Sequence, residues 1–296
     1  HVGTDVIRQA VKSIRREIIA RGGQVCFEKR LSDFTINQRL IESITINEKE
    51  QIPCSVLVLA VGNSARDVFR LLHRKGVALI SKAFAVGLRI EHPQTWVDRV
   101  QFGDFAGHPR LGAADYHLTF QDRISGRSLY TFCMCPGGYV IGAASEPGQV
   151  VTNGMSYFAR DSGRANSALV VTVGPPDWQN KTLGGVELQE RLEKRAFEMG
   201  NRTYKAPAQW VKDFLLRRRS HSLNGSFATF QPGVVASNLW ELLPRELGEV
   251  MERGLKNWEG RMKGFTSEPA VLTGIETRTS TPLRIVRGEG LNSIDF

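Results

Sequence analysis

The sequence has few cysteines, no long hydrophobic run and no metal-ligand cluster, and each shortage excludes a class of protein. Four cysteines in 296 residues are too few for a disulfide scaffold and are typical of a reducing compartment. The longest apolar runs, residues 56–61 and 168–173, are much shorter than the roughly 20 residues that cross a bilayer. No basic-then-apolar leader opens the chain. The sequence therefore predicts a cytoplasmic protein without a membrane segment.

Metal ions and nucleic acids are also not expected as partners. The six histidines are scattered singly, and no His/Cys cluster has zinc spacing, so no metal site is predicted. The net charge is +9, and the first 90 residues hold 15 Lys and Arg against 8 Asp and Glu. Much of this charge falls on predicted helices that also have an apolar face. A solvated helix surface is therefore favoured over a nucleic-acid contact.

The first 82 residues have the pattern of a nucleotide-binding unit. Residues 5–21 carry apolar side chains at helical spacing, which predicts an amphipathic helix. Short strands at 24–27 and 31–34 and a polar hairpin at 48–51 follow. The apolar, β-branched run 55–61 predicts a parallel strand buried on both faces. A helix begins after Gly62, with Ser64 and Asp67 spaced as a capping box.

From residue 83 the pattern changes to shorter strands and three helices. Extended patterns separated by Gly, Pro and Asn occupy residues 84–90, 116–120, 128–133, 139–144 and 168–173. Helical patterns occupy residues 188–199, 207–217 and 246–263, and strands return at 270–275 and 283–286. The predicted fold is α/β with an inserted α+β domain. Its predicted divisions are 1–82 (part of the nucleotide-binding unit), 83–266 (the inserted α+β domain) and 267–296 (the return to the nucleotide-binding unit).

Six segments resemble those of a known family, and they occur in the same order. They are residues 56–67 (VLVLAVGNSARD), 84–94 (FAVGLRIEHPQ), 130–138 (YTFCMCPGG), 153–156 (NGMS), 165–168 (ANSA) and 274–284 (GIETRTSTPLR). Together they resemble the bacterial FAD-dependent dehydrogenases, largely uncharacterised flavoproteins of the glutathione-reductase-like FAD/NAD(P)-binding fold. This resemblance implies a three-layer FAD/NAD(P)-binding cofactor domain, of which residues 1–82 and 267–296 are parts, and an inserted domain at 83–266 on the substrate side. It also implies an FAD cofactor and an oxidoreductase activity on a small-molecule substrate. NAD(P)H is a candidate electron donor.

Two cofactor motifs of that family are missing from this sequence. Its FAD fingerprint, a Gly-x-Gly-x-x-Gly turn that holds the pyrophosphate at a helix N-terminus, does not occur here. Its glycine-rich tail, which lies against the flavin, does not occur either. The resemblance therefore implies a central fragment of a longer flavoprotein, inactive alone and unable to bind FAD tightly. The helix at 5–21 should then have an uncovered apolar face, and either self-association or an N-terminal third that is less ordered than the rest is expected.

The resemblance also implies a set of cofactor-binding residues. Ala60, Val61 and Gly62 resemble a second cofactor-contacting turn, and Leu31 lies where such folds bond the adenine through main-chain atoms. Ser64 and Arg66 follow that turn, although capping and the helix surface explain them equally well. A later loop, Arg278, Thr279 and Ser280, resembles one that lies near the flavin in this family. Arg278 is a candidate to steady an anionic flavin or a substrate carboxylate.

The remaining candidates concern cysteine and proton chemistry. Cys133 and Cys135 are two apart on a predicted strand, so their side chains should share one face. They are either a strained, easily reduced redox pair or two small buried fillers, and the second interpretation is favoured. Cys26 and Cys54 are predicted to be core residues. Glu91 and His92 point to opposite faces of a strand, which favours structural roles over proton transfer.

Three functions remain open at the level of sequence. The favoured one is the FAD-dependent oxidoreductase that the resemblance implies. The second is a flavoprotein that interacts with RNA or tRNA through the basic N-terminal third. The third is a thiol-redox enzyme that uses Cys133 and Cys135.

Overall fold

The computed structural model of the chain describes residues 2–290 and 292–295, which divide into two compact units. Unit 1 contains the residues up to Arg8, Phe84–Val173 and Leu188–Thr279. Unit 2 contains Gln9–Ala83, Gly174–Glu187 and the residues from Ser280 onward. Each unit is described by itself below.

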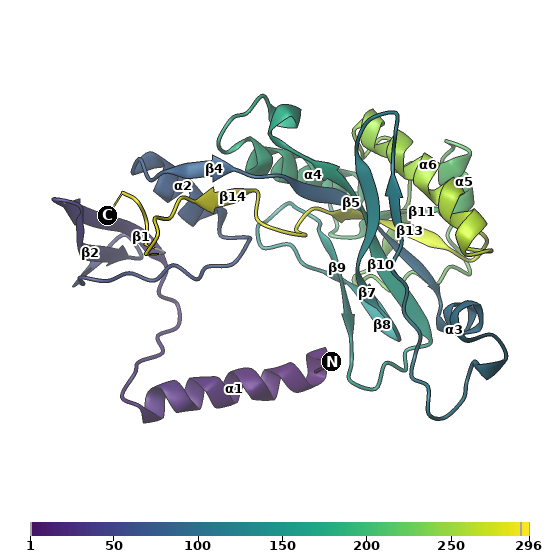
Figure 1. Cartoon of the computed structure of the whole chain (residues 1–296), viewed down its shortest axis with the longest axis horizontal. Coiled ribbons are helices and arrows are strands. Elements are labelled where there is room, and N and C mark those ends of the chain that lie inside the picture. The colour runs from purple at the N-terminus through teal and green to yellow at the C-terminus, as the bar shows by residue number, and fades with distance from the viewer. Residues whose placement is uncertain (1, 291, 296) are drawn as a thin grey trace. The chain divides into compact units, whose positions relative to one another are not determined.

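A seven-stranded mixed sheet forms the centre of unit 1 (Figure 1). The strands, in their order across the sheet, are β12 (Val234–Ala236), β11 (Ala206–Trp210), β13 (Val271–Glu276), β5 (Phe84–Pro93), β10 (Arg164–Val173), β7 (Ser128–Cys135) and β6 (Thr119–Gln121). Neighbours pair antiparallel except β11 and β12, which are parallel. The sequence correctly predicts the mixed α/β class.

The two longest strands, β5 and β10, form the middle of this sheet. They pair without interruption from Phe84 opposite Val173 to Pro93 opposite Arg164. Nearly every residue of both strands is buried. Continuous burial explains why the predicted strands at 84–90 and 168–173 read as apolar runs rather than as alternating patterns.

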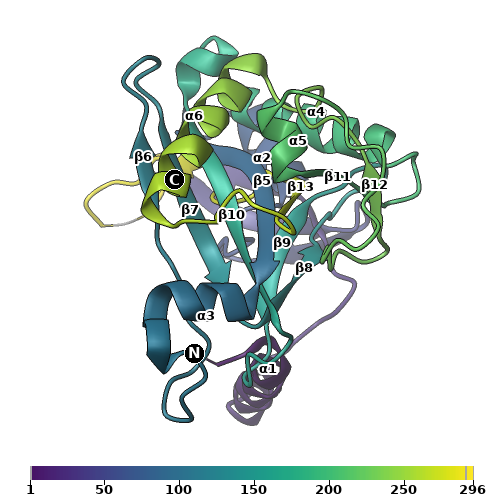
Figure 2. The same ribbon diagram turned by 90° about the vertical axis from the view of Figure 1, so that its right-hand side faces the viewer.

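Helices and a hairpin cover the two faces of the sheet (Figure 2). Helix α6 (Arg245–Arg261) packs against β10, β7 and β6, and a Cβ at its Gly254 would lie 2.2 Å from a side-chain carbon of Leu129 on β7. The hairpin of β8 (Gly138–Gly142) and β9 (Thr152–Ser156) packs on the sheet as well. Helix α3 (Gln94–Phe102), the 3-10 turn η1 (Gly103–Phe105) and helix α5 (Val211–Leu215) also belong to unit 1. The 3-10 turn η2 (Pro175–Trp178) belongs to unit 2, and helix α4 (Gly184–Met199) begins in unit 2 and continues in unit 1 from Leu188.

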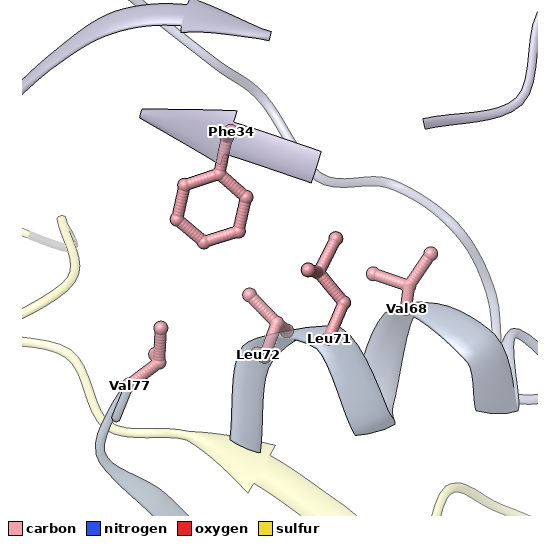
Figure 3. Close-up of a cluster of buried hydrophobic side chains, with 5 residues drawn as sticks. All are labelled: Phe34, Val68, Leu71, Leu72 and Val77. Carbon is pink, nitrogen blue, oxygen red and sulfur yellow. The ribbon is translucent and has the colours of Figure 1, made fainter. Parts of the chain in front are cut away.

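Unit 2 has a small core between a strand and a helix (Figure 3). Strands β1 (Leu31–Asn37), β2 (Leu40–Ile46) and β3 (Glu50–Pro53) form an antiparallel sheet. Phe34 on β1 points toward Val68, Leu71 and Leu72 of helix α2 (Arg66–Arg74), with Val77 beside them. A second, two-stranded sheet pairs β4 (Leu79–Ser81) with β14 (Leu283–Ile285). The predicted hairpin at 48–51 is confirmed as the turn into β3.

Four local predictions are wrong. Residues 55–61 form no strand: Val56 and Val58 are 77% and 82% exposed, because no described strand lies beside this run to pair with it. Residues 24–27 also lack strand pairing. The N-cap of α2 is Ala65 without a side-chain cap, so the capping box does not form. Residues 207–217 are not one helix, because the first of them pair with β13 as strand β11. Only the five residues of α5 are helical.

Helix α1 (Thr4–Ala20) confirms the helix predicted at 5–21, and it exposes its apolar stripe. None of its residues is buried, and Ile7, Val11, Ile14 and Ile18 are each 43–62% exposed. Among the described residues, no helix combines the length and apolar character needed to cross a membrane.

We predict that this stripe drives self-association. Changing Val11 and Ile14 to Gln together removes apolar surface that association would otherwise cover, at about 1.5–3 kcal/mol for each large side chain fully buried. The double variant should shift toward monomer in light scattering at matched concentration. As a control, Lys12→Gln with Arg16→Gln alters the same helix without touching the stripe and should leave association in place. A wild-type chain that is strictly monomeric would contradict this prediction.

A second prediction concerns the C-terminal boundary of the inserted domain, for which the sequence predicts residues 83–266. Strand β13 lies beyond that limit, yet all six of its residues are buried and it pairs with both β5 and β11. We expect residues 83–279 to unfold cooperatively at a higher temperature than residues 83–266, which would lose an interior strand. Thermal unfolding and limited proteolysis of both fragments measure this. Equal stability of the two would support the boundary at 266.

Candidate functional site

A buried arginine, Arg89 on β5, lies at the centre of the most polar part of the unit 1 interior. Its side chain is 0% exposed, and its Nε donates to Glu276 Oε2 at 3.1 Å. Its Nη2 lies 3.4 Å from Glu276 Oε1, and its Nη1 donates to Asn166 Oδ1 at 2.6 Å. Nη1 and Nη2 also donate to the Cys133 carbonyl oxygen, at 3.3 and 3.4 Å. One guanidinium therefore joins residues of β5, β13, β10 and β7.

Two further contacts extend this group. Thr152 on β9 donates from its hydroxyl to Glu276 Oε2 at 3.2 Å, and Cys135 Sγ lies 4.0 Å from Arg89 Nη1. We call the set the Arg89 cluster. It comprises Arg89, Cys133, Cys135, Thr152, Asn166 and Glu276.

Charge balance keeps the arginine ionised in this position. Burial lowers the pKa of Arg89, but the Glu276 carboxylate and the two cysteines Cys135 and Cys133 together outweigh burial, and the net shift is upward. A buried ion pair of this kind is strongly destabilised when one partner is removed, by about 3–5 kcal/mol, because the other charge remains uncompensated. The cluster is therefore expected to hold the sheet in a single arrangement.

A glycine on β9 makes room for the guanidinium. A Cβ at Gly154 would lie 1.7 Å from Arg89 Nη1 and 2.4 Å from Asn166 Oδ1, far inside any real contact. The hairpin strand can thus lie against the cluster only without a side chain at this position.

Five of the six segments that carry the family resemblance meet at this cluster. Residues 84–94 contain Arg89, residues 130–138 contain the two cysteines, and residues 153–156 contain Gly154, which makes room for the guanidinium. Residues 165–168 contain Asn166, and residues 274–284 contain Glu276. The sixth segment, 56–67, lies in unit 2. The segments and the cysteines are recognisable from sequence, whereas the roles of Arg89, Asn166 and Glu276 are not. The available signal was a charged residue within an otherwise apolar, fully buried strand.

The two cysteines of the cluster do not share an environment, contrary to the sequence prediction. Phe132 pairs with Ala168 and Cys135 with Asn166, so β7 has one more residue than β10 over this stretch. This bulge interrupts the alternation of side chains, and Cys133 has a φ of +45°. Cys133 is exposed, Cys135 is buried, and both are free thiols. Cys133 is therefore not a buried filler. The prediction that Cys26 and Cys54 are core residues is also wrong, because Cys26 is exposed and Cys54 is partly exposed.

The predicted loop at 278–280 is engaged with other protein groups. Arg278 is paired with Glu193 at 2.9 Å, and its Nη1 donates to the Ser145 hydroxyl at 2.6 Å. Its side chain is 8% exposed. Thr279 bonds the backbone of Ala85 at the start of β5, with its hydroxyl donating to the carbonyl at 2.9 Å. Ser280 is partly buried. Contact of these residues with a flavin stays a prediction.

The other predicted cofactor residues all lie in unit 2. Leu31 opens β1 opposite Ile46 and packs against the core of Figure 3. Ala60, Val61 and Gly62 are exposed in the segment before α2, and Gly62 has a φ of +76° with nothing within 4 Å of its added Cβ.

The next two candidates differ in exposure. Ser64 donates to the Asn63 side chain at 2.9 Å, and Arg66 is the buried first residue of α2, 1% exposed. Arg66 is thus not on the helix surface.

Glu91 and His92 confirm the predicted opposite orientations on β5. The Glu91 carboxylate accepts from Thr229, at 3.0 Å from its N–H and 2.6 Å from its hydroxyl. His92 Nε2 lies 2.8 Å from the Phe265 carbonyl, so this nitrogen carries the proton, and the ring stacks on Trp96 at 4.6 Å. Both side chains are buried. The pair serves two separate packing sites and shares no proton.

Burial raises the pKa of Glu91 and lowers the pKa of His92, so the two side chains make stability depend on pH in opposite ways. It raises the pKa of Glu91 to about 7, against the lowering effects of the Thr229 hydrogen bonds and of Arg89 and Arg164. It lowers the pKa of His92 to about 4, against the hydrogen bond to Phe265. The Glu91 contribution to stability is present below pH 4.5 and is lost as the pH rises to 7. The His92 contribution is present above pH 6.5 and is lost as the pH falls to 4.

We predict that Glu91→Gln changes how the free energy of unfolding depends on pH. Gln can still accept from Thr229 but does not titrate, so only the rising His92 contribution remains. Relative to wild type, the free energy of unfolding of the variant should increase by about 2–3 kcal/mol between pH 4.5 and 7. Denaturant unfolding at a series of pH values measures the difference. A difference between Glu91→Gln and wild type that does not change with pH would contradict the prediction.

No metal-binding arrangement accompanies these sites. Within residues 2–290 and 292–295, no three His, Cys, Asp or Glu side chains gather as metal ligands would. A surface hollow of about 390 Å³ in unit 2 is lined by polar residues that include Asp33, Arg74 and Lys75. None of the predicted cofactor residues lines it.

Comparison with known proteins shows the family to which this chain belongs. Residues 83–279, which contain the whole Arg89 cluster, match the model of the FAD-dependent protein, C-terminal domain-like family. An uncharacterised protein of Clostridium beijerinckii (strain ATCC 51743 / NCIMB 8052) is 47% identical over 296 residues, which are 100% of this chain and 55% of that protein. The chain thus spans about half the length of the curated relative it matches. It belongs to the family of FAD-dependent proteins that this C-terminal domain-like region defines.

Proposed function

We propose that this chain is part of a longer FAD-dependent oxidoreductase and supplies its substrate side together with a portion of its cofactor domain. The observation that carries the proposal is the family match over residues 83–279, because that family is described as FAD-dependent. The length of the Clostridium relative supports a longer parent protein. In this proposal unit 1 supplies a wall of the substrate site, and the Arg89 cluster keeps its sheet rigid.

The finer features of the parent protein belong to the same proposal. Unit 2 would be part of a glutathione-reductase-like, three-layer FAD/NAD(P)-binding domain. The strands described in unit 2 are antiparallel, so the parallel sheet of such a domain would need strands from outside this chain. The proposal does not include NAD(P)H, which no comparison supports, and the cytoplasmic location stays a prediction.

The residues of this chain fit a flavin cofactor only in part. The backbone at Gly62 is open to approach, and its positive φ suits glycine, as a close dinucleotide contact requires. Glu193, Ser145 and Gln149 already hold the guanidinium of Arg278, so its contact with a flavin stays a prediction. The sequence also lacks the glycine-rich phosphate turn. The chain therefore does not account for FAD binding by itself, and the phosphate cradle is assigned to the rest of the parent.

The first test of this proposal is the distribution of flavin. We predict that the longer parent protein purifies with FAD in about one-to-one ratio, and that the 296-residue chain purifies without it. The flavin absorbance band relative to protein concentration measures both. A parent protein without flavin would overturn the proposed function, and a yellow 296-residue chain would overturn the assignment of the cradle.

A pair of glycine variants tests the role of the turn at residues 60–62. Gly62 and Gly76 have nearly equal φ angles, +76° and +74°, and both have open space at the Cβ position. Ala at either site therefore has a similar backbone cost of about 1 kcal/mol. In the parent protein, Gly62→Ala should lower FAD occupancy and Gly76→Ala should not, at equal thermal stability. Equal occupancy in both variants would remove this turn from the cofactor site.

A further inference from the structure

We propose that Cys133 and Cys135 form a thiol–disulfide exchange centre that takes small-molecule disulfides, with Cys133 as the attacking sulfur and Cys135 as the resolving one. The proposal does not depend on flavin binding, because every residue that carries it lies in unit 1 of this chain.

The bulge in β7 gives the two sulfurs different access. It leaves Cys133 exposed, where a disulfide can reach it, and keeps Cys135 buried two residues later. The φ of +45° at Cys133 is uncommon for a residue with a side chain and is a feature that clusters at functional sites. The packing around Cys135 is tight, since a Cβ at Gly138 would lie 3.0 Å from the Cys135 Cβ.

Contacts of the Arg89 cluster hold the pair in position. The Cys135 thiol donates to the Cys133 carbonyl oxygen at 3.3 Å, and Arg89 donates to the same oxygen through two nitrogens. Arg89 Nη1 also lies 4.0 Å from Cys135 Sγ. A fixed positive charge therefore lies beside both sulfurs, and Glu276 and Asn166 prevent it from moving away.

This arrangement divides the two thiols chemically. The neighbouring Cys135 side chain lowers the pKa of Cys133 to about 6, with further lowering by Arg89 and opposition from burial and from the Glu276 charge. The interaction with Cys133, together with burial, raises the pKa of Cys135. At neutral pH Cys133 is then mostly thiolate, the nucleophilic form, and Cys135 is a protonated thiol.

The exchange balances with a disulfide as the only co-reactant. The Cys133 thiolate attacks one sulfur of R–S–S–R, forming a Cys133–S–R bond and releasing one thiolate R–S⁻, which takes up the proton lost by Cys135. Cys135 sulfur then attacks Cys133 Sγ, forming the Cys133–Cys135 disulfide and releasing the second R–S⁻, which is protonated from water. The two cysteines lose two electrons, and the substrate disulfide gains them as two thiols.

The first experiment measures the reactivity of Cys133 in the reduced 296-residue chain. Alkylation by iodoacetamide is followed peptide by peptide from pH 5 to 9, with exposed Cys26 as the internal control. Near pH 6.5 about three-quarters of a thiol of pKa 6 is ionised, against about 1% of an ordinary one. Its lower intrinsic nucleophilicity offsets about tenfold of that advantage, so Cys133 should react roughly sevenfold faster than such an ordinary thiol. Equal rates and a common midpoint would overturn the proposal.

The second experiment traps the exchange intermediate. Reduced wild type treated with glutathione disulfide should form a Cys133–Cys135 disulfide and release two equivalents of glutathione. Cys135→Ser should stop at a single mixed disulfide between Cys133 and glutathione, and Cys133→Ser should form neither product. Cys54→Ser is the matched control and should behave as wild type, with thermal unfolding confirming that each variant is folded.

The results that contradict the exchange centre are distinct from those that contradict a flavin role. A Cys135→Ser chain without the mixed disulfide, or a wild-type chain that stops at the mixed disulfide, would overturn the assigned roles. Both outcomes can be read in the absence of FAD. Failure here therefore leaves the proposed oxidoreductase function standing, and success does not establish it.

Discussion

The buried ion pair between Arg89 and Glu276 is the interaction on which the organisation of unit 1 depends. Its partners are 187 residues apart in the sequence and lie on neighbouring strands of one sheet. Removing both charges from water is costly, and the pair is tolerated because Asn166, Thr152 and the Cys133 carbonyl satisfy the remaining donors and acceptors. The same requirement for satisfied partners fixes where β9, β10 and β7 must lie.

This constraint links the fold to the candidate chemistry. The guanidinium that neutralises Glu276 also lies beside the two sulfurs, so the charge that orders the sheet is the charge that favours a thiolate at Cys133. Gly154 allows β9 to approach the cluster closely, and the bulge in β7 exposes Cys133 while burying Cys135. In the proposed exchange centre, the interior charge that holds the sheet therefore also acts on a thiol at its surface.

The sequence predicted the elements whose pattern reflects local burial and missed the features that depend on distant partners. Strands β5 and β10 were predicted because continuous apolar runs require cover on both faces. The run 55–61 has the same pattern, but the described chain offers it no neighbouring strand, and it stays exposed. A hydrophobic pattern indicates that a segment would be stable as a buried strand, but it does not indicate whether a neighbouring strand is present to pair with it.

The candidate site shows the same division. The segments of the cluster were recognisable as motifs, yet nothing local in them indicates that Arg89 meets Glu276 or that β7 contains a bulge. Alternation in an ideal strand placed both cysteines on one face, and one extra residue was enough to separate their environments. Arg278 looked available for a ligand because its partner Glu193 lies 85 residues earlier.

The central claim is that Arg89 and Glu276 act as a single unit, and a double-mutant cycle on the free energy of unfolding tests it most directly. Arg89→Met and Glu276→Met should each destabilise the chain by about 3–5 kcal/mol, because each leaves a buried charge without its partner. The double variant leaves no buried charge, so its loss should be clearly smaller than the sum of the two single losses. Losses that simply add would show that the two residues contribute independently and would contradict this account.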